Sequence, residues 1–415
     1  MKKIIGMTFP RQDVTLGLEP SLLTVLPDGD NVMYSMENID FDDNNVQMYA
    51  CSVYITGMNE FKKWALKHDK NKIIVGGYEP TINPDEFLPY ASKVIVGPCD
   101  DFYATINQEG AIVKGITNYK KIPRYDLYDI RNNQQIIPDK LKDDVCTSIN
   151  TSQGCPFNCD FCCSPLMCDR LMSKPIELIE EEINYLKQYN PKYIFIRDEN
   201  FPLQKDFKER LEVISGLDAN IYLFASANLL SVDTVEFMKL HNVYMVCLGL
   251  EDITVNYAKN KELDKACDLL HKNNIMTYLS FIVNPLKVHS EEESRDFYDK
   301  LLERFYELKP EMVCGNFLMP FRGTKIWDQY KDLVSTDDYD LYTSKSAFLE
   351  KDLEIRKRME YEMFYYQWEY YTSEFYKENV RDFFKEDTLH LRFLELKEEF
   401  EKKGIPKSYQ KCLRR

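Results

Sequence analysis

Three cysteines, Cys155, Cys159 and Cys162, stand within eight residues in the run Gly-Cys-Pro-Phe-Asn-Cys-Asp-Phe-Cys. Thiols this close together on one short segment can all reach one small metal centre. A four-iron cluster is held by cysteine thiolates and ordinarily takes four of them. A loop with three cysteines therefore leaves one iron without a protein ligand, open to a substrate or cofactor. The spacing predicts an iron–sulfur site with one exchangeable position.

Two other interpretations of these cysteines stay open. A structural zinc site closes with four ligands, usually in two pairs, but the chain has no second pair at finger-like spacing and only five histidines. Buried cysteines without a metal are common, yet three of them flanked by Gly154 and Pro156 suit neither a helix nor a strand. We interpret Cys163, next to the last cysteine, as a neighbour and not as a fourth ligand. Cys168 is interpreted as an incidental cysteine, with a reactive thiol near the site as the alternative.

The composition limits the class of protein. With 415 residues the chain has room for two or three domains. Its net charge of −15 disfavours nucleic acid as a partner. Twelve cysteines in a long chain without an apolar signal segment are typical of a reduced, cytoplasmic protein. No apolar run approaches the roughly 18 residues that a membrane span needs, so we expect no membrane segment.

The first region, residues 1–117, alternates short apolar strands with helical segments. The expected strands are Ile4–Phe9, Val46–Ile55, Lys72–Val75 and Lys93–Val96, and the expected helices are Asn59–His68 and Asp85–Tyr90. This alternation favours a parallel, Rossmann-like sheet. Gly76 and Gly77 end the third strand and open a predicted loop over Tyr78–Asp85, where glycine lets the backbone turn sharply and approach a ligand.

A polar, proline-containing linker over residues 118–143 leads to a second region, residues 144–330. The expected strands there are Val145–Thr151, Tyr193–Arg197, Ile221–Ala225, Val243–Leu250, Met276–Val283 and Met312–Leu318. The expected helices are Ile176–Tyr189, Lys205–Leu217, Val232–His241, Val255–Lys272 and Glu291–Leu308. Strands and helices in this order imply a partial parallel (β/α)6 barrel, with active residues at the carboxyl ends of its strands.

The third region, residues 331–415, is acidic, aromatic and mostly helical. Aromatic side chains crowd Met359–Tyr376, which is typical of core packing or of a docking face, and substrate stacking stays a further option. The tail after Gly404 is basic. The whole chain is thus expected to be an α/β protein with a Rossmann-like sheet, a central partial barrel and a C-terminal helical region.

The cysteine run resembles the signature of radical S-adenosylmethionine (SAM) enzymes, in which an aromatic residue, here Phe161, precedes the last cysteine. The resemblance implies that the three cysteines bind a [4Fe–4S] cluster and that SAM chelates the fourth iron, with Phe161 beside the cofactors. It also implies reductive cleavage of SAM to a 5′-deoxyadenosyl radical, which abstracts a substrate hydrogen. The electron would come from a flavodoxin- or ferredoxin-type donor.

The first region resembles the cobalamin-binding-type domain that precedes many radical SAM cores. The matching stretches are Val75-Gly-Gly-Tyr-Glu-Pro-Thr81 and Val94-Ile-Val-Gly97, so Gly76 and Gly77 are expected cofactor contacts. Two departures stand out: the Asp-x-His-x-x-Gly motif is absent, and the segment between the first strand and Asn31 is short. The domain is therefore either a cobalamin site or a shortened scaffold that no longer holds the corrin.

The carboxyl ends of the barrel strands carry the expected SAM contacts. Asp198 and Glu199 follow the second strand, where the family has an acidic pair near the amino group of SAM; a helix N-cap cluster is the alternative. Glu251 ends the fourth strand in Leu-Gly-Leu-Glu, which resembles the family segment whose glutamate contacts the SAM ribose. A carboxylate accepting two hydroxyl hydrogen bonds suits a ribose.

Three further contacts are expected from the resemblance. Ser226 and Asn228 follow the third strand, where many relatives carry an arginine, and would contact the SAM ribose or carboxylate. Arg322 stands in Met-Pro-Phe-Arg-Gly-Thr, which matches the family's Pro-x-Pro-Gly-Thr segment with arginine in place of its second proline. It would meet an anionic substrate or the SAM carboxylate, and a surface arginine in a turn is the alternative.

The resemblance covers residues 1–330 and implies a radical SAM enzyme. The leading interpretation is cobalamin-dependent methylation of an unactivated carbon in a small-molecule or natural-product substrate. A cobalamin-independent rearrangement, elimination or dehydrogenation is the alternative. From a different class, the chain could be a binding module that uses a cluster as a sensor, although a bare cluster needs no ribose-type carboxylate. No residue pattern identifies a catalytic side chain or the substrate.

Overall fold

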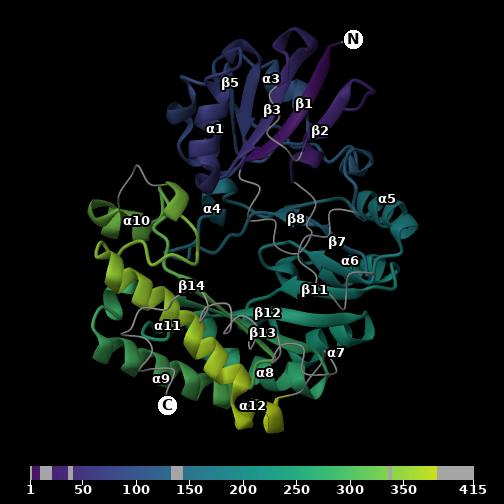
Figure 1. Ribbon diagram of the computed structural model, residues 1–415. Helices are drawn as coiled ribbons and strands as arrows, with labels where there is room; N and C mark the ends of the chain where they lie inside the picture. The colour runs from purple at the N-terminus through teal and green to yellow at the C-terminus, as the bar shows by residue number, and fades with distance from the viewer. Residues whose placement is uncertain (1, 10–20, 36–40, 132–143, 335–338, 381–415) are drawn as a thin grey trace. The chain divides into compact units, whose positions relative to one another are not determined.

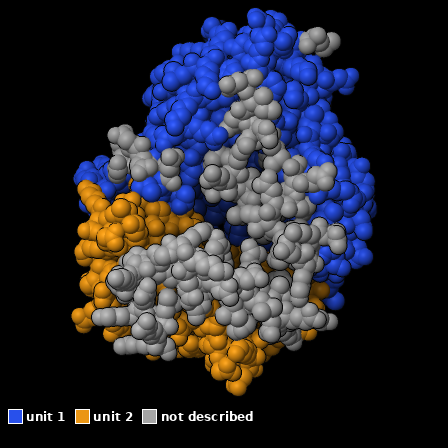
Figure 2. Space-filling model, in the orientation of Figure 1, with its two compact units in different colours: residues 1–225, 240–243, 320–343 blue, residues 226–239, 244–319, 344–415 orange. Residues whose placement is uncertain are grey.

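The computed structural model describes residues 2–9, 21–35, 41–131, 144–334 and 339–380. The chain forms two compact units, coloured separately in Figure 2. Unit 1 comprises residues 1–225, 240–243 and 320–343, and unit 2 comprises residues 226–239, 244–319 and 344–415. The basic tail after Gly404 lies outside the described residues. The division of the chain at residues 117, 143 and 330 stays a prediction.

The N-terminal part of unit 1 contains a six-stranded parallel sheet with the order β2-β1-β3-β4-β5-β6, in purple and blue in Figure 1. Its strands are β1 Lys3–Phe9, β2 Val32–Ser35, β3 Val46–Val53, β4 Ile73–Gly76, β5 Lys93–Val96 and β6 Ile112–Lys114. Its helices are α1 Met58–Ala65, α2 Tyr78–Ile82 and α3 Phe102–Ile106. The predicted parallel sheet is confirmed, with two short strands, β2 and β6, that no apolar run revealed.

This sheet has apolar residues on both faces, as parallel sheets usually do. Ile4, Ile5, Met7 and Phe9 of β1 are all fully buried. Phe9 packs edge-on against Phe61 of α1 with ring centroids 5.5 Å apart, and such aromatic pairs add to the stability gained by burial. These core residues hold the sheet together. The residues at the carboxyl ends of its strands are therefore available for other roles.

Two local predictions at this edge are wrong. The expected loop over Tyr78–Asp85 begins with helix α2, because Pro80 falls in the first helical turn, where no backbone N–H is needed. The expected helix over Asp85–Tyr90 is only a single 3-10 turn, Pro84–Phe87. Both segments are too short for an amphipathic period to develop.

The second six-stranded sheet has the hydrogen-bonded order β14-β13-β12-β11-β10-β7. Its strands are β7 Cys146–Ile149, β10 Tyr193–Ile196, β11 Asn220–Phe224, β12 Val243–Glu251, β13 Met276–Val283 and β14 Met312–Phe317. All six match predicted strands to within a few residues, and sequential neighbours pair in parallel in β7–β10, β10–β11, β12–β13 and β13–β14. This confirms the α/β class and the predicted barrel-type order of strands.

In unit 1, helices α5 Ile176–Leu186 and α6 Phe207–Ser215 accompany β7, β10 and β11. Unit 1 also holds a small hairpin of β8 Ser152–Gln153 and β9 Met172–Ser173, the one-turn helix α4 Ser164–Met167, and α10 Lys325–Tyr330. The hairpin matters most for function, because the three cysteines lie between its two strands.

Unit 2 contains β12, β13 and β14 and the helices that precede, connect and follow them. These helices are α7 Val232–Leu240, α8 Leu263–Lys272, α9 Glu291–Leu308, α11 Leu353–Thr372 and α12 Glu374–Asn379. The expected helix over Val255–Lys272 begins later than predicted, with α8.

Tyr370 and Tyr371 of α11 are buried and donate hydrogen bonds to the carbonyls of Pro310 and Val313. These two rings are therefore core residues. In the described residues no helix is both long and apolar enough to cross a membrane.

Candidate active site

The cysteine loop is closed at its base by the β8–β9 hairpin. Ser152 pairs with Ser173 and Gln153 with Met172, so the chain leaves and returns at the same place. Gly154 follows β8 with a φ of +87°, and a Cβ on it would lie 2.2 Å from the Arg170 carbonyl oxygen. Only glycine fits this position, and the sharp turn carries the chain directly into Cys155.

The three cysteines of the loop are all half-buried, and no cysteine in the described residues forms a disulfide. The amide of Cys162 donates to the Cys159 carbonyl over 3.1 Å. Burial raises the pKa of Cys155, and the neighbouring Cys162, Glu199 and Cys159 add to the rise. These groups are therefore close enough to interact, and a positive charge among them would favour the thiolates.

The spacing of these thiols bears on the kind of metal centre. A cubane cluster takes each thiolate on a different iron, so its ligands stand further apart than the ligands of one ion. The donor set of three neighbouring thiols on one closed loop fits such a cluster.

Asp198 and Glu199, which follow β10, occupy different environments. Asp198 is fully buried and accepts hydrogen bonds from the backbone and hydroxyl groups of Thr151 and Ser152. Glu199 faces the cavity described below and interacts with the backbone amide of Gly154. Burial raises the pKa of both carboxyl groups. Only Glu199 is placed where it could meet a ligand, and its contact with SAM stays a prediction.

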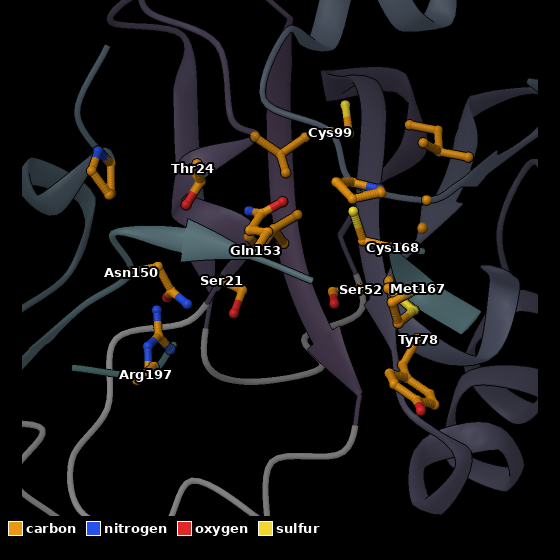
Figure 3. Close-up of a pocket in the computed structure, with 18 of the residues that line it drawn as sticks. Ser21, Thr24, Ser52, Tyr78, Cys99, Asn150, Gln153, Met167, Cys168 and Arg197 are labelled. Carbon is orange, nitrogen blue, oxygen red and sulfur yellow. The ribbon is translucent and has the colours of Figure 1, made fainter. Parts of the chain in front are cut away.

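A cavity of about 300 Å³ lies within unit 1, between the carboxyl edge of the N-terminal sheet and the cysteine loop. Figure 3 shows side chains from both sides of it. The sheet contributes Ser52 near the end of β3, Gly76 to Tyr78 at and after the end of β4, and Gly97 to Cys99 after β5. The loop and the neighbouring strand ends contribute Asn150, Gln153, Met167, Cys168, Arg197 and Glu199. Carboxyl ends of parallel strands are where α/β proteins bind ligands.

The sheet side of this cavity is edged by glycines. Gly77 has a φ of +98°, and a Cβ there would lie 2.8 Å from the Ser52 hydroxyl. Gly97 also has a positive φ of +82°. Their bare Cα atoms let a flat ligand approach the backbone closely. The predicted ligand-facing position of Gly76 and Gly77 therefore agrees with their place in the lining.

Two buried polar atoms of the lining have no hydrogen-bond partner: the Tyr78 hydroxyl and Oε1 of Gln153. Buried polar groups are normally satisfied, so these atoms are ready to bind a ligand that carries amides or hydroxyls. Sequence reasoning missed both residues. Their only sequence signal is position, since Tyr78 follows the glycine pair and Gln153 precedes Gly154 and Cys155.

The cavity wall also contains a buried ion pair. Lys174 Nζ lies 2.5 Å from Glu182 Oε2, and the Tyr125 hydroxyl donates to the other carboxylate oxygen over 2.5 Å. All three side chains are buried. Lys174 follows β9, so this pair anchors the end of the cysteine loop to α5.

Arg322 lies in an ionic cluster with residues of the N-terminal sheet's helices. Its Nη1 is 2.8 Å from Glu86 and 3.6 Å from Glu79, and its guanidinium stacks over Trp327 and Tyr339. Lys62 reaches Glu86 over 2.6 Å. The carboxylate partners of Arg322 in the structure are therefore Glu79 and Glu86. Its contact with a cofactor or substrate stays a prediction.

The other expected SAM contacts belong to unit 2. Glu251 ends β12 beside a β-bulge, where Gly249 pairs with Ser280 and Glu251 with Phe281, and it has a left-handed φ of +61°. Strained non-glycine residues at strand ends often serve function. Ser226 precedes the 3-10 turn Ala227–Leu229, and Asn228 within that turn is exposed. Their roles stay predictions.

The fold and site define a class of α/β protein that has a Rossmann-like sheet, a barrel-type sheet and a three-cysteine loop. Residues 149–301 match the Radical SAM superfamily. The chain therefore contains a radical SAM domain and is an enzyme, as the sequence predicted.

Individual proteins and solved structures also resemble this chain. The chain is 23% identical over 350 residues to the bacteriochlorophyllide d C-8(2)-methyltransferase of Chlorobaculum tepidum, covering 76% of this chain and 75% of that protein. The structure resembles TsrM of Kitasatospora setae, a radical SAM methyltransferase with cobalamin and a [4Fe–4S] cluster bound, with a TM-score of 0.55 at 13% identity, over 80% of this chain and 78% of that one. It also resembles the cobalamin-dependent SAM radical enzyme OxsB, with a TM-score of 0.56 at 13% identity, over 95% and 71% of the two chains.

Proposed function

We propose that this radical SAM enzyme is a cobalamin-dependent methyltransferase that acts on an unactivated carbon of a small molecule. The observation that carries the proposal is the cavity of unit 1, which joins the carboxyl edge of the N-terminal sheet to the cysteine loop. The likeness of the whole fold to two cobalamin-dependent enzymes supports the same function.

Residues of this chain suit each of the three cofactors. Cys155, Cys159 and Cys162 would hold the cluster. Glu199, beside Gly154 and Cys155, would meet the cationic amino group of SAM, and Glu251 would bind its ribose. Gly76, Gly77 and Gly97 leave room for the flat corrin, while Gln153 and Tyr78 offer buried polar atoms to its amide rim. When bound, the cluster and SAM supply the substrate radical and cobalamin supplies the methyl group.

The protein's contribution is to position these groups and to exclude water. The cavity is lined largely by apolar side chains such as Leu22, Val25, Ile74 and Met167, which shield reactive species from solvent. A cytoplasmic location is part of the proposal, because a long chain with twelve cysteines is typical of a reducing compartment. A flavodoxin- or ferredoxin-type electron donor is part of the proposal.

A cobalamin-independent radical reaction is the second candidate. It is favoured by the short, proline-containing segment between the first strand and Asn31, which leaves little room for the usual first helix. In that case the N-terminal sheet would serve as a scaffold for the cysteine loop.

The test uses the full chain, reconstituted anaerobically with iron and sulfide and then incubated with hydroxocobalamin. After gel filtration we expect stoichiometric corrin absorbance, and with SAM and dithionite we expect 5′-deoxyadenosine. Cluster assembly and SAM cleavage without retained corrin would instead favour the cobalamin-independent reaction.

Gly76→Leu sharpens this test, because Gly76 lines the cavity. A Cβ added at this position would lie 3.4 Å from the Ile95 Cβ. We expect loss of corrin retention with SAM cleavage preserved. Ala111→Leu is the matched control, since Ala111 is exposed directly before β6 and does not line the cavity. Equal corrin retention by both variants would exclude this cavity as the corrin site.

A further inference from the structure

We propose that Asp198 and Arg210 are positioning residues, which clamp the two ends of the cysteine loop and thereby set the placement of its three thiols. This inference rests on the iron–sulfur site proposed above. It gives Asp198 a task other than contact with SAM, and it gives Arg210 a task that no sequence motif indicates.

Asp198 binds the beginning of the loop. Its carboxylate accepts from the amides of Thr151 and Ser152 at 2.7 and 3.1 Å, and from their hydroxyls at 2.5 and 2.7 Å. Gln204 Nε2 adds a fifth hydrogen bond at 2.8 Å. A carboxylate offers about four lone-pair positions, so these five donors saturate it. Because Asp198 is also fully buried, it has neither an open lone pair nor access to a ligand.

Arg210 joins the beginning of the loop to its end. Its Nη1 donates to the carbonyl oxygen of Lys174 at 2.7 Å and to that of Thr151 at 3.2 Å. The amide of Lys174 donates to the same Thr151 carbonyl at 2.8 Å. Thr151 precedes β8 and Lys174 follows β9, so one guanidinium holds both ends of the loop together.

Arg210 is itself held in place. Asp206, one turn earlier in the chain, binds its Nε and Nη2 at 2.8 and 2.7 Å. Such paired contacts fix both position and orientation. The side chain of Arg210 is only 3% exposed, while that of Asp206 is 39% exposed. The aspartate therefore anchors the arginine from the surface side of α6.

Burial explains why both residues matter. Burying a charge is costly unless every partner is present, and removing one partner leaves the others unsatisfied. Loss of Asp198 would leave the buried Thr151 and Ser152 amides without an acceptor at the very start of the loop. We therefore expect the loop, and not the sheet behind it, to respond first.

The experiment compares Asp198→Ala, Asp198→Asn and Arg210→Lys in the full chain. Amide hydrogen exchange over residues 152–173 is measured without the cluster, and iron content and the electron paramagnetic resonance spectrum of the reduced cluster are measured after reconstitution. We expect exchange at least tenfold faster and most of the iron lost in Asp198→Ala. Asp198→Asn, which keeps an acceptor oxygen, should recover part of both, with a broadened spectrum.

Glu311→Gln is the matched control. Glu311 is a buried carboxylate that accepts the Thr277 amide at 2.7 Å in unit 2, and its loss should leave loop exchange and iron content unchanged. If Asp198→Ala does not fold, Thr151→Val removes one of the clamp's hydroxyls with little change in volume. Unchanged iron content and spectrum in a folded clamp variant would overturn the inference. Because exchange is measured without cofactors, the clamp stays testable even if the cluster or cobalamin assignment fails.

Discussion

Among the strand ends with positive φ angles, those of β4 and β12 carry opposite residue types. After β4, Gly77 has a φ of +98°, whereas at the end of β12, Glu251 has a φ of +61°. Glycine adopts such angles without cost, while any other residue is strained there. The first end therefore keeps side chains away from a cavity, and the second end retains a carboxylate despite the strain.

This difference suggests what each strand end is for. Gly77 and its neighbours leave backbone exposed to a ligand, in line with the proposed corrin site. Glu251 is 7% exposed. It is followed by Asp252, whose carboxylate binds Lys287 at 2.9 Å and accepts a hydrogen bond from the Thr254 amide. A retained strained residue is a sign of function, so Glu251 is the stronger candidate for a direct cofactor contact.

Gly77→Ala should have the largest effect. The combination of φ +98° and ψ −156° at Gly77 is open essentially only to glycine, so we expect a loss of about 2–3 kcal/mol in the free energy of unfolding. Urea denaturation followed by circular dichroism measures this loss. The double variant Gly77→Ala with Ser52→Gly removes the 2.8 Å contact with the Ser52 hydroxyl.

We expect little rescue in this double variant, because a single hydroxyl can rotate away whereas the backbone strain remains. Full rescue by Ser52→Gly would show that side-chain crowding, and not backbone conformation, requires glycine at this strand end.

Glu79, two residues after Gly77, should make stability depend on pH. It is 1% exposed, and burial raises its pKa to about 7, while Arg322 opposes the rise and Glu86 adds to it. Because the folded pKa lies above the usual value, the unfolded chain loses its proton first as the pH rises. Stability should therefore fall by about 3 kcal/mol between pH 4.5 and 7 and stay level above that. Glu79→Gln should remove this slope.

Glu86→Gln is the control for this slope. The neighbours Lys62, Tyr339 and Arg322 outweigh burial and lower the pKa of Glu86 to about 2, so its contribution is present above pH 4.5 and is lost as the pH falls toward 2. Glu86→Gln should weaken the protein and reduce the slope between pH 4.5 and 7 only in part, because Glu86 adds to the rise in the pKa of Glu79 but burial, the largest cause of that rise, remains. If the stability of the wild-type protein did not fall between pH 4.5 and 7, the raised pKa of the buried Glu79 would be contradicted.

Much of the strand framework could be predicted from the sequence, because most strands of the second sheet are largely apolar runs between helical patterns, as in Tyr193–Ile196. The cysteine loop could also be located, since it directly follows the first of these strands. The β8–β9 hairpin could not, because strands of two residues have no detectable period.

The partners of Asp198 were equally hidden. Thr151 and Ser152 lie 47 and 46 residues earlier in the chain, and no local pattern links them to an aspartate. Arg210 did leave a signal: it falls on the buried side of α6 beside Leu211 and Ile214, four residues after Asp206. A charged residue on an apolar helix face, with an opposite charge one turn away, indicates a buried ion pair.

Replacing Glu251 tests the other strand end, with the smallest expected effect on stability. Glu251→Ala keeps the left-handed strain and loses the carboxylate, whereas Glu251→Gly loses both. The glycine variant should therefore be more stable than the alanine variant by about 1 kcal/mol. Thermal unfolding of the two variants measures the difference.

Formation of 5′-deoxyadenosine at limiting SAM separates strain from chemistry at Glu251. If the carboxylate binds the SAM ribose, both variants should lose SAM affinity to the same extent, despite their different stabilities. Equal stability of the two variants would show that no strain is held at this strand end. Wild-type SAM affinity in either variant would remove Glu251 from the site, and the retained left-handed glutamate would then be explained by its packing at the β-bulge alone.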